Sequence, residues 1–161
     1  MIKKIQLKTS FEVYDSLDVL SQEDKGLMQA AKKAIKSAYA PYSHFQVGAA
    51  VLLEDAKVVT GNNQENAAYP SGMCAERVAI WNAASRFPDL KVKKIALAVK
   101  SSTKVVDKPV SPCGACRQTL LEYEVKQNEP IAVLFMGEVG KVIKANSLSD
   151  LLPFSFDESF L

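Results

Sequence analysis

The stretch CAERVAIWNAAS (Cys74–Ser85) is apolar almost all around a helical circumference, a pattern typical of a helix buried in the centre of a domain. Strands are predicted on both sides of this helix: 46–53 and 57–61 precede it, joined by a short turn at 54–56, and the strongly apolar segment 92–99 follows it. A central helix flanked by such strands indicates an α/β layered domain, with a sheet covered by helices.

The same alternation continues toward both ends of the chain. Ser21 has the features of a helix N-cap, and the helix that it starts runs until Pro41 ends it. Beyond residue 99 the pattern predicts a second central helix, two strands and a short capped helix, in that order, at 114–125, 131–136, 141–145 and 147–152. No repeat or linker divides the chain, so we expect one domain over residues 1–161.

Residues 1–20 form an extension ahead of the first predicted helix. Ile5, Leu7, Phe11 and Val13 stand at odd positions, the period of two that is typical of a strand with one buried face. The extension therefore predicts an additional strand, whose role the sequence leaves open.

The amino-acid composition indicates which kinds of partner the protein can bind and in which cellular compartment it works. The chain has 20 basic and 18 acidic residues, and its lysines are scattered, which argues against a nucleic-acid partner or a membrane-surface helix. No apolar run approaches the roughly 20 residues needed to cross a bilayer, and the N-terminus lacks the apolar region of a signal peptide. We therefore expect a cytoplasmic protein, in which three cysteines favour a metal or catalytic role over disulfides.

Two short motifs carry the chemistry, Cys74-Ala75-Glu76-Arg77 and Pro112-Cys113-Gly114-Ala115-Cys116. Both lie at predicted helix starts, where free amides and the helix dipole stabilise thiolates. Three thiolates bind zinc readily, and a catalytic zinc keeps three protein ligands and one position for water. C-x-E together with P-C-x-x-C is the signature of zinc deaminases, in which the glutamate is a general acid and base rather than a ligand.

Three other interpretations of the cysteines remain open at this point. They could be small core residues, or Cys113 and Cys116 could form a redox pair. The strongest rival is a closed structural zinc site in which His44, the only histidine, supplies the fourth ligand. The match of two separate segments to one signature favours the catalytic interpretation.

The sequence resembles the cytidine deaminase family, in its small homotetrameric branch with a three-cysteine zinc site. Blocks in the family's order cover most of residues 21–156, and they lie at 39–50, 61–70, 74–77, 111–118 and 151–156. The resemblance implies a three-layer α/β/α fold around a mixed sheet of about five strands. It also implies one Zn²⁺ per chain, held by Cys74, Cys113 and Cys116, with Glu76 moving protons and Arg77 bonded to the ligand thiolates.

The same resemblance implies a set of residues that bind the substrate, namely Phe45, Asn63, Glu65, Tyr69, Ala75 and Phe156. Asn63 and Glu65 would hold the ribose hydroxyls, and Phe45 would pack against the nucleoside. Without the resemblance, Asn63 would be interpreted as a turn residue and Glu65 as a surface carboxylate. Phe156 would reach over a neighbouring subunit's pocket, although Phe154 competes for that role.

The function implied is hydrolysis of cytidine, and of deoxycytidine, to the uracil nucleoside and ammonia in pyrimidine salvage. The expected partners are a small pyrimidine nucleoside and further copies of the chain, with shared active sites, and neither nucleic acid nor a membrane. Three alternatives remain: an editing deaminase acting on nucleic acid, a deaminase of a related nucleoside such as blasticidin S, and a non-enzymatic module stabilised by zinc. A preference between ribose and deoxyribose is left open.

Overall fold

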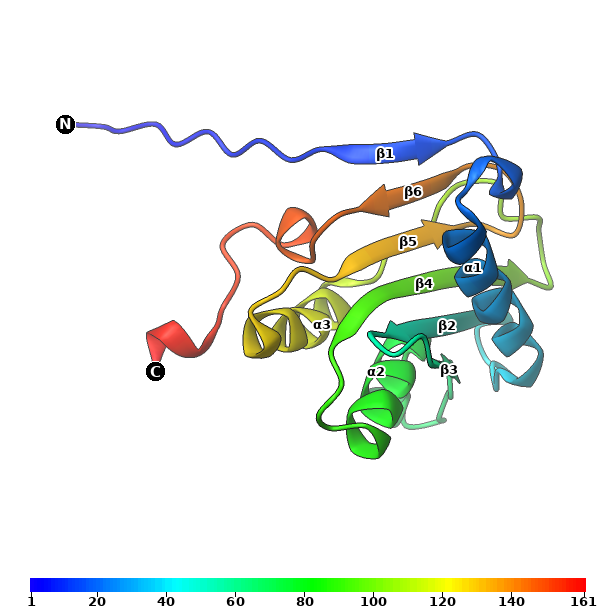
Figure 1. Ribbon diagram of the computed structural model, residues 1–161. Helices are drawn as coiled ribbons and strands as arrows, with labels where there is room; N and C mark the ends of the chain where they lie inside the picture. The colour runs from blue at the N-terminus through cyan, green and yellow to red at the C-terminus, as the bar shows by residue number, and fades with distance from the viewer.

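A six-stranded mixed sheet forms the centre of the computed structural model, which describes residues 1–161 (Figure 1). The strands lie in the order β1-β6-β5-β4-β2-β3, and of the neighbouring pairs only β4 and β5 run parallel. The strands are β1 (Phe11–Tyr14), β2 (Phe45–Leu53), β3 (Val58–Asn62), β4 (Val92–Ser101), β5 (Ala132–Met136) and β6 (Val142–Ala145). The expected mixed sheet is confirmed, with six strands instead of about five.

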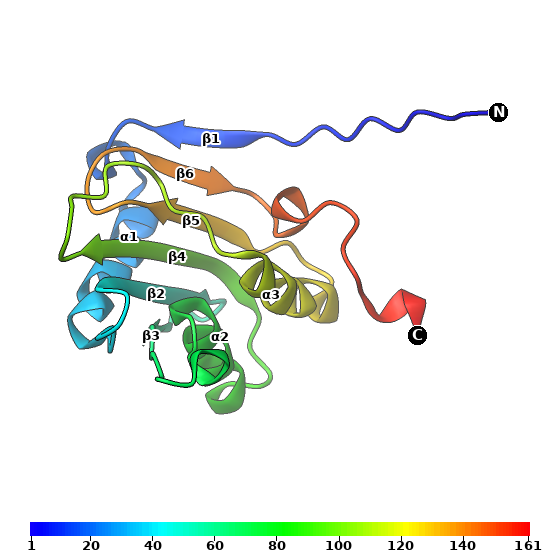
Figure 2. The same ribbon diagram turned by 180° about the vertical axis from the view of Figure 1, so that it is seen from behind.

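Helices cover both faces of this sheet. α1 (Gln22–Ala34) lies on one face, and α2 (Ala75–Arg86) and α3 (Gly114–Gln127) lie on the other, as the two opposite views show (Figures 1 and 2). Alternation along β2 builds the two cores: Ala49 packs with the α2 and α3 side chains, and Ala50 packs with those of α1. The expected three-layer α/β/α arrangement is confirmed.

A buried ion cluster fixes α1 on its face of the sheet. Ser21 caps the helix, with its hydroxyl accepting from the Asp24 amide at 3.1 Å. Asp24 is only 3% exposed, and its carboxylate accepts from Lys94 of β4 at 2.5 Å and from Lys144 of β6 at 3.1 Å. The charge of this carboxylate is therefore compensated by two strands at once.

Glycine in β3 allows α2 to lie directly on the sheet. A Cβ at Gly61 would lie 2.4 Å from the Ala79 nitrogen and 2.8 Å from the Ala75 oxygen, closer than atoms can approach. Any side chain there would push the first turns of α2 away from the sheet. The position of that helix start, which carries Cys74 and Glu76, therefore depends on Gly61.

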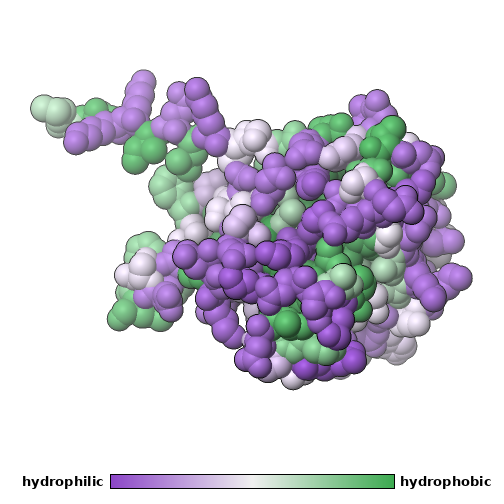
Figure 3. All heavy atoms as spheres, viewed as in Figure 1, coloured by the Kyte–Doolittle hydropathy of each residue, from purple (hydrophilic) through white to green (hydrophobic).

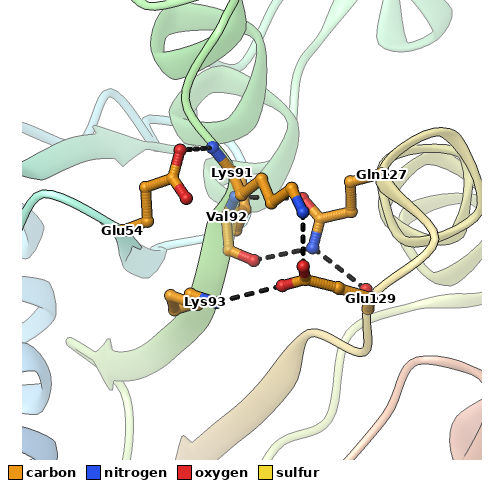
Figure 4. Close-up of polar contacts among 6 residues, drawn as sticks. All are labelled: Glu54, Lys91, Val92, Lys93, Gln127 and Glu129. Carbon is orange, nitrogen blue, oxygen red and sulfur yellow. Dashed lines mark hydrogen bonds and ion pairs between the residues drawn. The ribbon is translucent and has the colours of Figure 1, made fainter.

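A polar network fixes the end of α3 to the start of β4 (Figure 4). The Gln127 amide accepts from the Val92 nitrogen at 3.0 Å and donates to the Val92 oxygen at 2.9 Å. Lys91 donates from its side chain to Glu129 and from its backbone to Glu54, at 3.1 Å in the second case. These contacts hold α3 at its C-terminal end.

The N-terminal strand is shorter and more exposed than predicted. β1 begins at Phe11, so that Ile5 and Leu7 lie outside any strand, and the predicted buried face is wrong, because Phe11 and Val13 are 43% and 57% exposed. β1 lies at the edge of the sheet and pairs with β6 alone. The N-terminal tail projects from the body of the domain (Figure 3).

Two predicted helices also need correction. α2 is buried along one face only, since Ala79 and Ile80 are fully buried whereas Trp81 is 41% exposed. The helix predicted at 147–152 is a single 3₁₀ turn, Ser149–Leu151. None of the helices combines the length and the apolar character that spanning a membrane would require.

Candidate metal centre and active site

The starts of α2 and α3 bring the three cysteines together. Cys74 is the N-cap residue of α2, Cys113 is the N-cap residue of α3, and Cys116 lies in the first turn of α3. Their sulfur atoms all lie within 4.8 Å of one another. Neither N-cap cysteine uses its side chain to cap its helix, so the sulfurs are free to bind a metal ion.

This donor set fits zinc. Tetrahedral zinc with Zn–S bonds of about 2.3 Å places its sulfurs roughly 3.8 Å apart, which the cluster can reach with small adjustments. His44 is exposed and supplies no atom to the cluster, so the closed four-ligand site is not formed. All three cysteines share the cluster, whereas a redox pair would need only two of them. The cluster therefore fits one zinc ion per chain, which it would hold through three protein ligands.

Charge at the cluster is balanced by Arg77. Its Nη2 donates to the Cys74 sulfur at 3.6 Å, and its Nε is buried without a protein partner, so the guanidinium faces the cluster with a donor to spare. In the metal-free protein the neighbouring Cys116 thiol and Arg77 together favour the Cys74 thiolate, and lower the Cys74 pKa to about 5. The closeness of Cys74, together with burial, raises the Cys116 pKa.

Glu76 lies in the first turn of α2, next to the cluster. It is only 6% exposed, yet it borders the main cavity of the protein. Burial, followed by the negative charge on Cys74, raises the Glu76 pKa to about 7. A carboxyl with this pKa can both take up and release a proton near neutral pH, as a general acid and base must.

The cavity has a volume of about 610 Å³ and opens above the cluster. It brings together most of the residues predicted to form the site, namely Phe45, Asn63, Glu65, Tyr69, Cys74, Glu76, Arg77 and Cys113. Its remaining walls come from β2 and β4, from the loop before β2, from the segment between β3 and α2, and from the loop before α3. Both apolar and polar side chains line it, which suits a ligand with a flat ring and a hydroxylated sugar.

The two predicted sugar-binding residues differ in how they are held. The Asn63 side chain accepts from the Val47 amide at 2.8 Å and donates to the Phe45 oxygen at 2.9 Å, which ties it to β2 and leaves one lone pair and one N–H free. Glu65 is half-buried, and its carboxylate accepts from the Tyr42 amide at 2.9 Å and from the Ser43 amide at 3.2 Å. Asn63 is therefore part of the framework, whereas Glu65 holds a surface loop.

Two of the predicted substrate-binding residues lie outside the cavity wall, as does the buried Cys116. The Ala75 side chain is fully buried in the core between α2 and the sheet. Phe156 is 57% exposed and stacks on Phe160, with the ring centroids 5.7 Å apart, and Phe154 is 85% exposed. Neither aromatic contributes to the cavity of its own chain.

Sequence reasoning missed several residues that shape the site. Tyr42 lies at the cavity beside the predicted Tyr69, with the two tilted ring centroids 6.0 Å apart, and Ser43 donates its hydroxyl to Glu65. Arg117, directly after Cys116, bonds the loop that carries Cys113. Its position directly after the second cysteine motif indicated that Arg117 lies near the site. Sequence spacing could not predict which residues its guanidinium bonds.

Comparison with known proteins gives a consistent result. The family model described as cytidine and deoxycytidylate deaminase zinc-binding region matches residues 21–129. A cytidine deaminase of Halalkalibacterium halodurans is 40% identical over 130 residues, which are 81% of this chain and 91% of that protein. A cytidine deaminase structure from Burkholderia pseudomallei superposes with a TM-score of 0.71 at 36% identity, covering 85% of this chain and 100% of the other.

A blasticidin-S deaminase of Bacillus cereus is more distant, at 28% identity over 141 residues, 85% of this chain and 94% of that protein. The matched region of the family model contains both cysteine motifs and the two helices that carry them. The three-sulfur cluster, with a buried carboxyl beside it, is the arrangement that the model's description leads one to expect. The chain therefore belongs to the cytidine and deoxycytidylate deaminase family with its zinc-binding region.

Proposed function

We propose that this protein catalyses the hydrolytic deamination of cytidine and deoxycytidine to uridine or deoxyuridine and ammonia. The observation that carries the proposal is Glu76, a carboxyl only 6% exposed that lies beside three metal-binding thiols at the wall of a cavity of about 610 Å³. The relatives named cytidine deaminase, up to 40% identical, support the same activity. A purely structural zinc module would use four protein ligands, and this cluster has three.

Cys74, Cys113 and Cys116 hold the metal in this proposal, and zinc with three protein ligands supplies an activated water as the nucleophile. Glu76 accepts one proton from the attacking water and delivers it to ring N3 while the new C4–O bond forms. Glu76 then passes the second proton to the exocyclic nitrogen, the C4–N bond breaks, and ammonia leaves. Both protons of the water are accounted for, one on N3 of the product and one on ammonia.

Other residues orient the nucleoside in the proposal. Glu65 accepts hydrogen bonds from the sugar hydroxyls, and Asn63 uses its remaining lone pair and N–H in the same place. Phe45 packs against the base and Tyr69 closes the mouth of the cavity. Ala75 takes part through its backbone, because the amides of the first turn of α2 have no acceptor within the helix.

The test measures ammonia release from cytidine together with zinc content. Protein with one zinc per chain should release one ammonia per uridine formed. Removing zinc with a chelator should abolish turnover, and adding zinc back should restore it. Folded, zinc-loaded protein that releases no ammonia from cytidine or deoxycytidine would overturn the proposal.

Deamination of blasticidin S is a second candidate, favoured by the 28% identity to the Bacillus cereus enzyme. That antibiotic lacks an ordinary ribose, so the pair Asn63 and Glu65 favours cytidine. Comparative kcat/KM on the two compounds decides between them, and a preference for blasticidin S would overturn the assignment of these two residues.

We infer further that residues 1–161 act as one domain, in a cytoplasmic homotetramer that serves pyrimidine salvage. Support for the assembly comes from exposed apolar side chains at two places. Trp81 on α2 is 41% exposed, and Phe154, Phe156, Phe160 and Leu161 are 57–98% exposed in the C-terminal segment. In this proposal, Phe156 of one subunit covers the cavity of a neighbour.

Mixing variants tests the shared site. Phe156→Ala subunits and Glu76→Gln subunits should each be nearly inactive alone. After demonstrated subunit exchange, some cavities would combine an intact Glu76 with a neighbour's intact Phe156, and activity should return. Exchange without any recovery, with both parents impaired, would count against sharing.

A further inference from the structure

Arg117 joins two segments that are far apart in the sequence. Its Nε donates to the Pro112 oxygen at 2.8 Å and its Nη2 to the Ser111 hydroxyl at 2.9 Å, both in the loop before α3. Its Nη1 donates to the Leu151 oxygen at 2.9 Å, at the start of the C-terminal segment. One guanidinium thus bonds the loop that carries Cys113 and the segment that carries Phe154 and Phe156.

The loop before α3 depends on this guanidinium for its position. The six residues Asp107–Pro112 make two hydrogen bonds, and both are donated by Arg117. Two of these residues are prolines, which have no amide proton to donate. Val110 and Ser111 line the cavity, and Cys113 follows directly. The position of one metal-binding sulfur and of one cavity wall therefore rests on Arg117.

The C-terminal segment is attached at the same place. Beyond Leu152, the hydrogen bond that joins residues 153–161 to the rest of the protein is donated by the Gln118 Nε2 to the Phe156 oxygen, at 2.8 Å. The other hydrogen bonds of these nine residues lie within the segment. Gln118 is the neighbour of Arg117 on α3, so two successive side chains hold both segments.

We propose that Arg117 is a positioning residue that couples the metal-binding loop to the C-terminal segment, with Gln118 extending the coupling to Phe156. Arginine suits this task because its planar group carries five donors in a fixed fork, so it can bind three acceptors at once. Lysine keeps the charge and cannot reproduce the fork. When the fork is lost, both segments should loosen together, although they lie about 40 residues apart in the chain.

The test uses zinc-loaded, full-length Arg117→Lys and measures how fast a protease of low specificity cleaves the chain within 107–113 and within 148–156. Both regions should be cleaved at least about tenfold faster than in the parent, because local opening becomes easier when hydrogen bonds from a charged donor are lost. Zinc should pass to a competing chelator about 10–100-fold faster, the usual effect of losing a group that orients a metal ligand. Arg86→Lys is the matched control, because Arg86 lies over the Phe87 ring and bonds neither segment.

Two further variants separate the parts of the coupling. Gln118→Ala should speed cleavage in the C-terminal segment alone, with zinc release unchanged. Ser111→Ala removes one of the three bonds and leaves the guanidinium intact, so it keeps the test available if Arg117→Lys fails to fold. It should speed cleavage in 107–113 alone.

In steady-state kinetics, Arg117→Lys should lower kcat for cytidine through the displaced cysteine, whereas Gln118→Ala should raise KM with kcat retained. This kinetic part rests on the proposed deamination, and the cleavage and zinc measurements do not. Folded Arg117→Lys in which either segment keeps the cleavage rate of the parent overturns the coupling, whatever the activity. Parent protein without deaminase activity would overturn the proposed function and leave the coupling to be judged by cleavage.

Discussion

The two sides of the cavity are built in different ways. On the metal side, helix starts fix every sulfur, Gly61 lets α2 lie on the sheet, and Glu76 is buried beside the cluster. On the nucleoside side, the Tyr42–Phe45 loop is exposed or half-buried, and the half-buried Glu65 carboxylate holds it by accepting hydrogen bonds from Tyr42 and Ser43.

This difference indicates a division of work. The groups on the metal side are already in position before any ligand binds, and stabilisation of a charged transition state requires such preorganised groups. The nucleoside side must exchange or share bonds when a sugar enters, because the Glu65 oxygens already accept from the loop. We therefore expect changes on the metal side to act on the chemical step, and changes on the nucleoside side to act on affinity.

The largest effect is expected from Cys116→Ser. Cys116 is fully buried, and a hydroxyl is a much poorer zinc ligand than a thiolate. Zinc content should fall well below one per chain, and turnover of cytidine should become undetectable. Metal analysis of purified protein checks this; full zinc occupancy would show that Cys116 is not a ligand.

Glu76→Gln should come next in size. Amide and carboxyl have nearly the same shape, so zinc and fold should be retained, and kcat should fall roughly 10²–10⁴-fold through loss of the proton carrier. Glu122→Gln, on the exposed face of α3, is the matched control and should keep the activity of the parent. Zinc lost together with activity in Glu76→Gln would mean that Glu76 is itself a ligand.

The same substitution should reveal the cost of burying Glu76 in the zinc-free protein. The folded-state pKa of about 7 lies above the ordinary value of 4.5, so the unfolded chain releases this proton first as pH rises. Stability should therefore fall between about pH 4.5 and pH 7, and the Glu76→Gln variant avoids this loss because its amide does not ionise.

Urea unfolding of both zinc-free proteins at pH 5 and pH 8 measures this effect. The advantage of Glu76→Gln should be larger at pH 8 by about 2 kcal/mol, given about 1.4 kcal/mol for each pH unit over which one state alone holds the proton. An advantage that is equal at both pH values would contradict the raised pKa.

A smaller effect is expected from Glu65→Gln, on the nucleoside side. The Ser43 hydroxyl holds the Glu65 pKa below its usual range, so the carboxylate is fully ionised at neutral pH. Loss of a charged acceptor should lower kcat/KM for cytidine about 10–100-fold, mainly through KM. Ser43→Ala disturbs the loop and spares the carboxylate, so an equal loss in both variants would assign the effect to the loop and not to the sugar.

The sequence predicted the metal side better than the nucleoside side, for a physical reason. Helix starts and ligand spacing are local properties, so Cys74, Glu76, Cys113 and Cys116 could be placed together from short motifs. The hydrogen-bond partners of side chains, in contrast, are set by the tertiary fold. Asn63 bonds residues that lie 16 and 18 positions away in the sequence, and Arg117 bonds Leu151, which lies 34 positions away.

The layers and the order of helices and strands were also predictable, whereas exposure was not. The apolar ring of α2 predicted a central helix, and the structure leaves Trp81 exposed on one side. The alternation in residues 1–13 predicted a buried strand face, and β1 lies at a sheet edge beside β6 only. A hydrophobic pattern shows which side chains favour burial and does not show whether the same chain covers them.

The smallest effect is expected from His44→Ala, which tests whether the division between the two sides is complete. His44 is the only histidine, and the rival structure for the cluster would use it as a fourth zinc ligand. Its side chain is exposed, its backbone has a left-handed φ of 56°, and its oxygen accepts from the Ser102 amide at 3.1 Å. The backbone therefore defines the position of His44 in the loop. In His44→Ala, zinc should stay at one per chain, and activity should change about twofold or less.

Alanine is strained at positive φ, whereas asparagine adopts this conformation readily, so His44→Asn is the matched variant. Lower activity in His44→Ala with recovery in His44→Asn would assign the effect to the loop backbone. Zinc lost from both variants would restore the closed four-ligand site and remove the open position on which the proposed reaction depends.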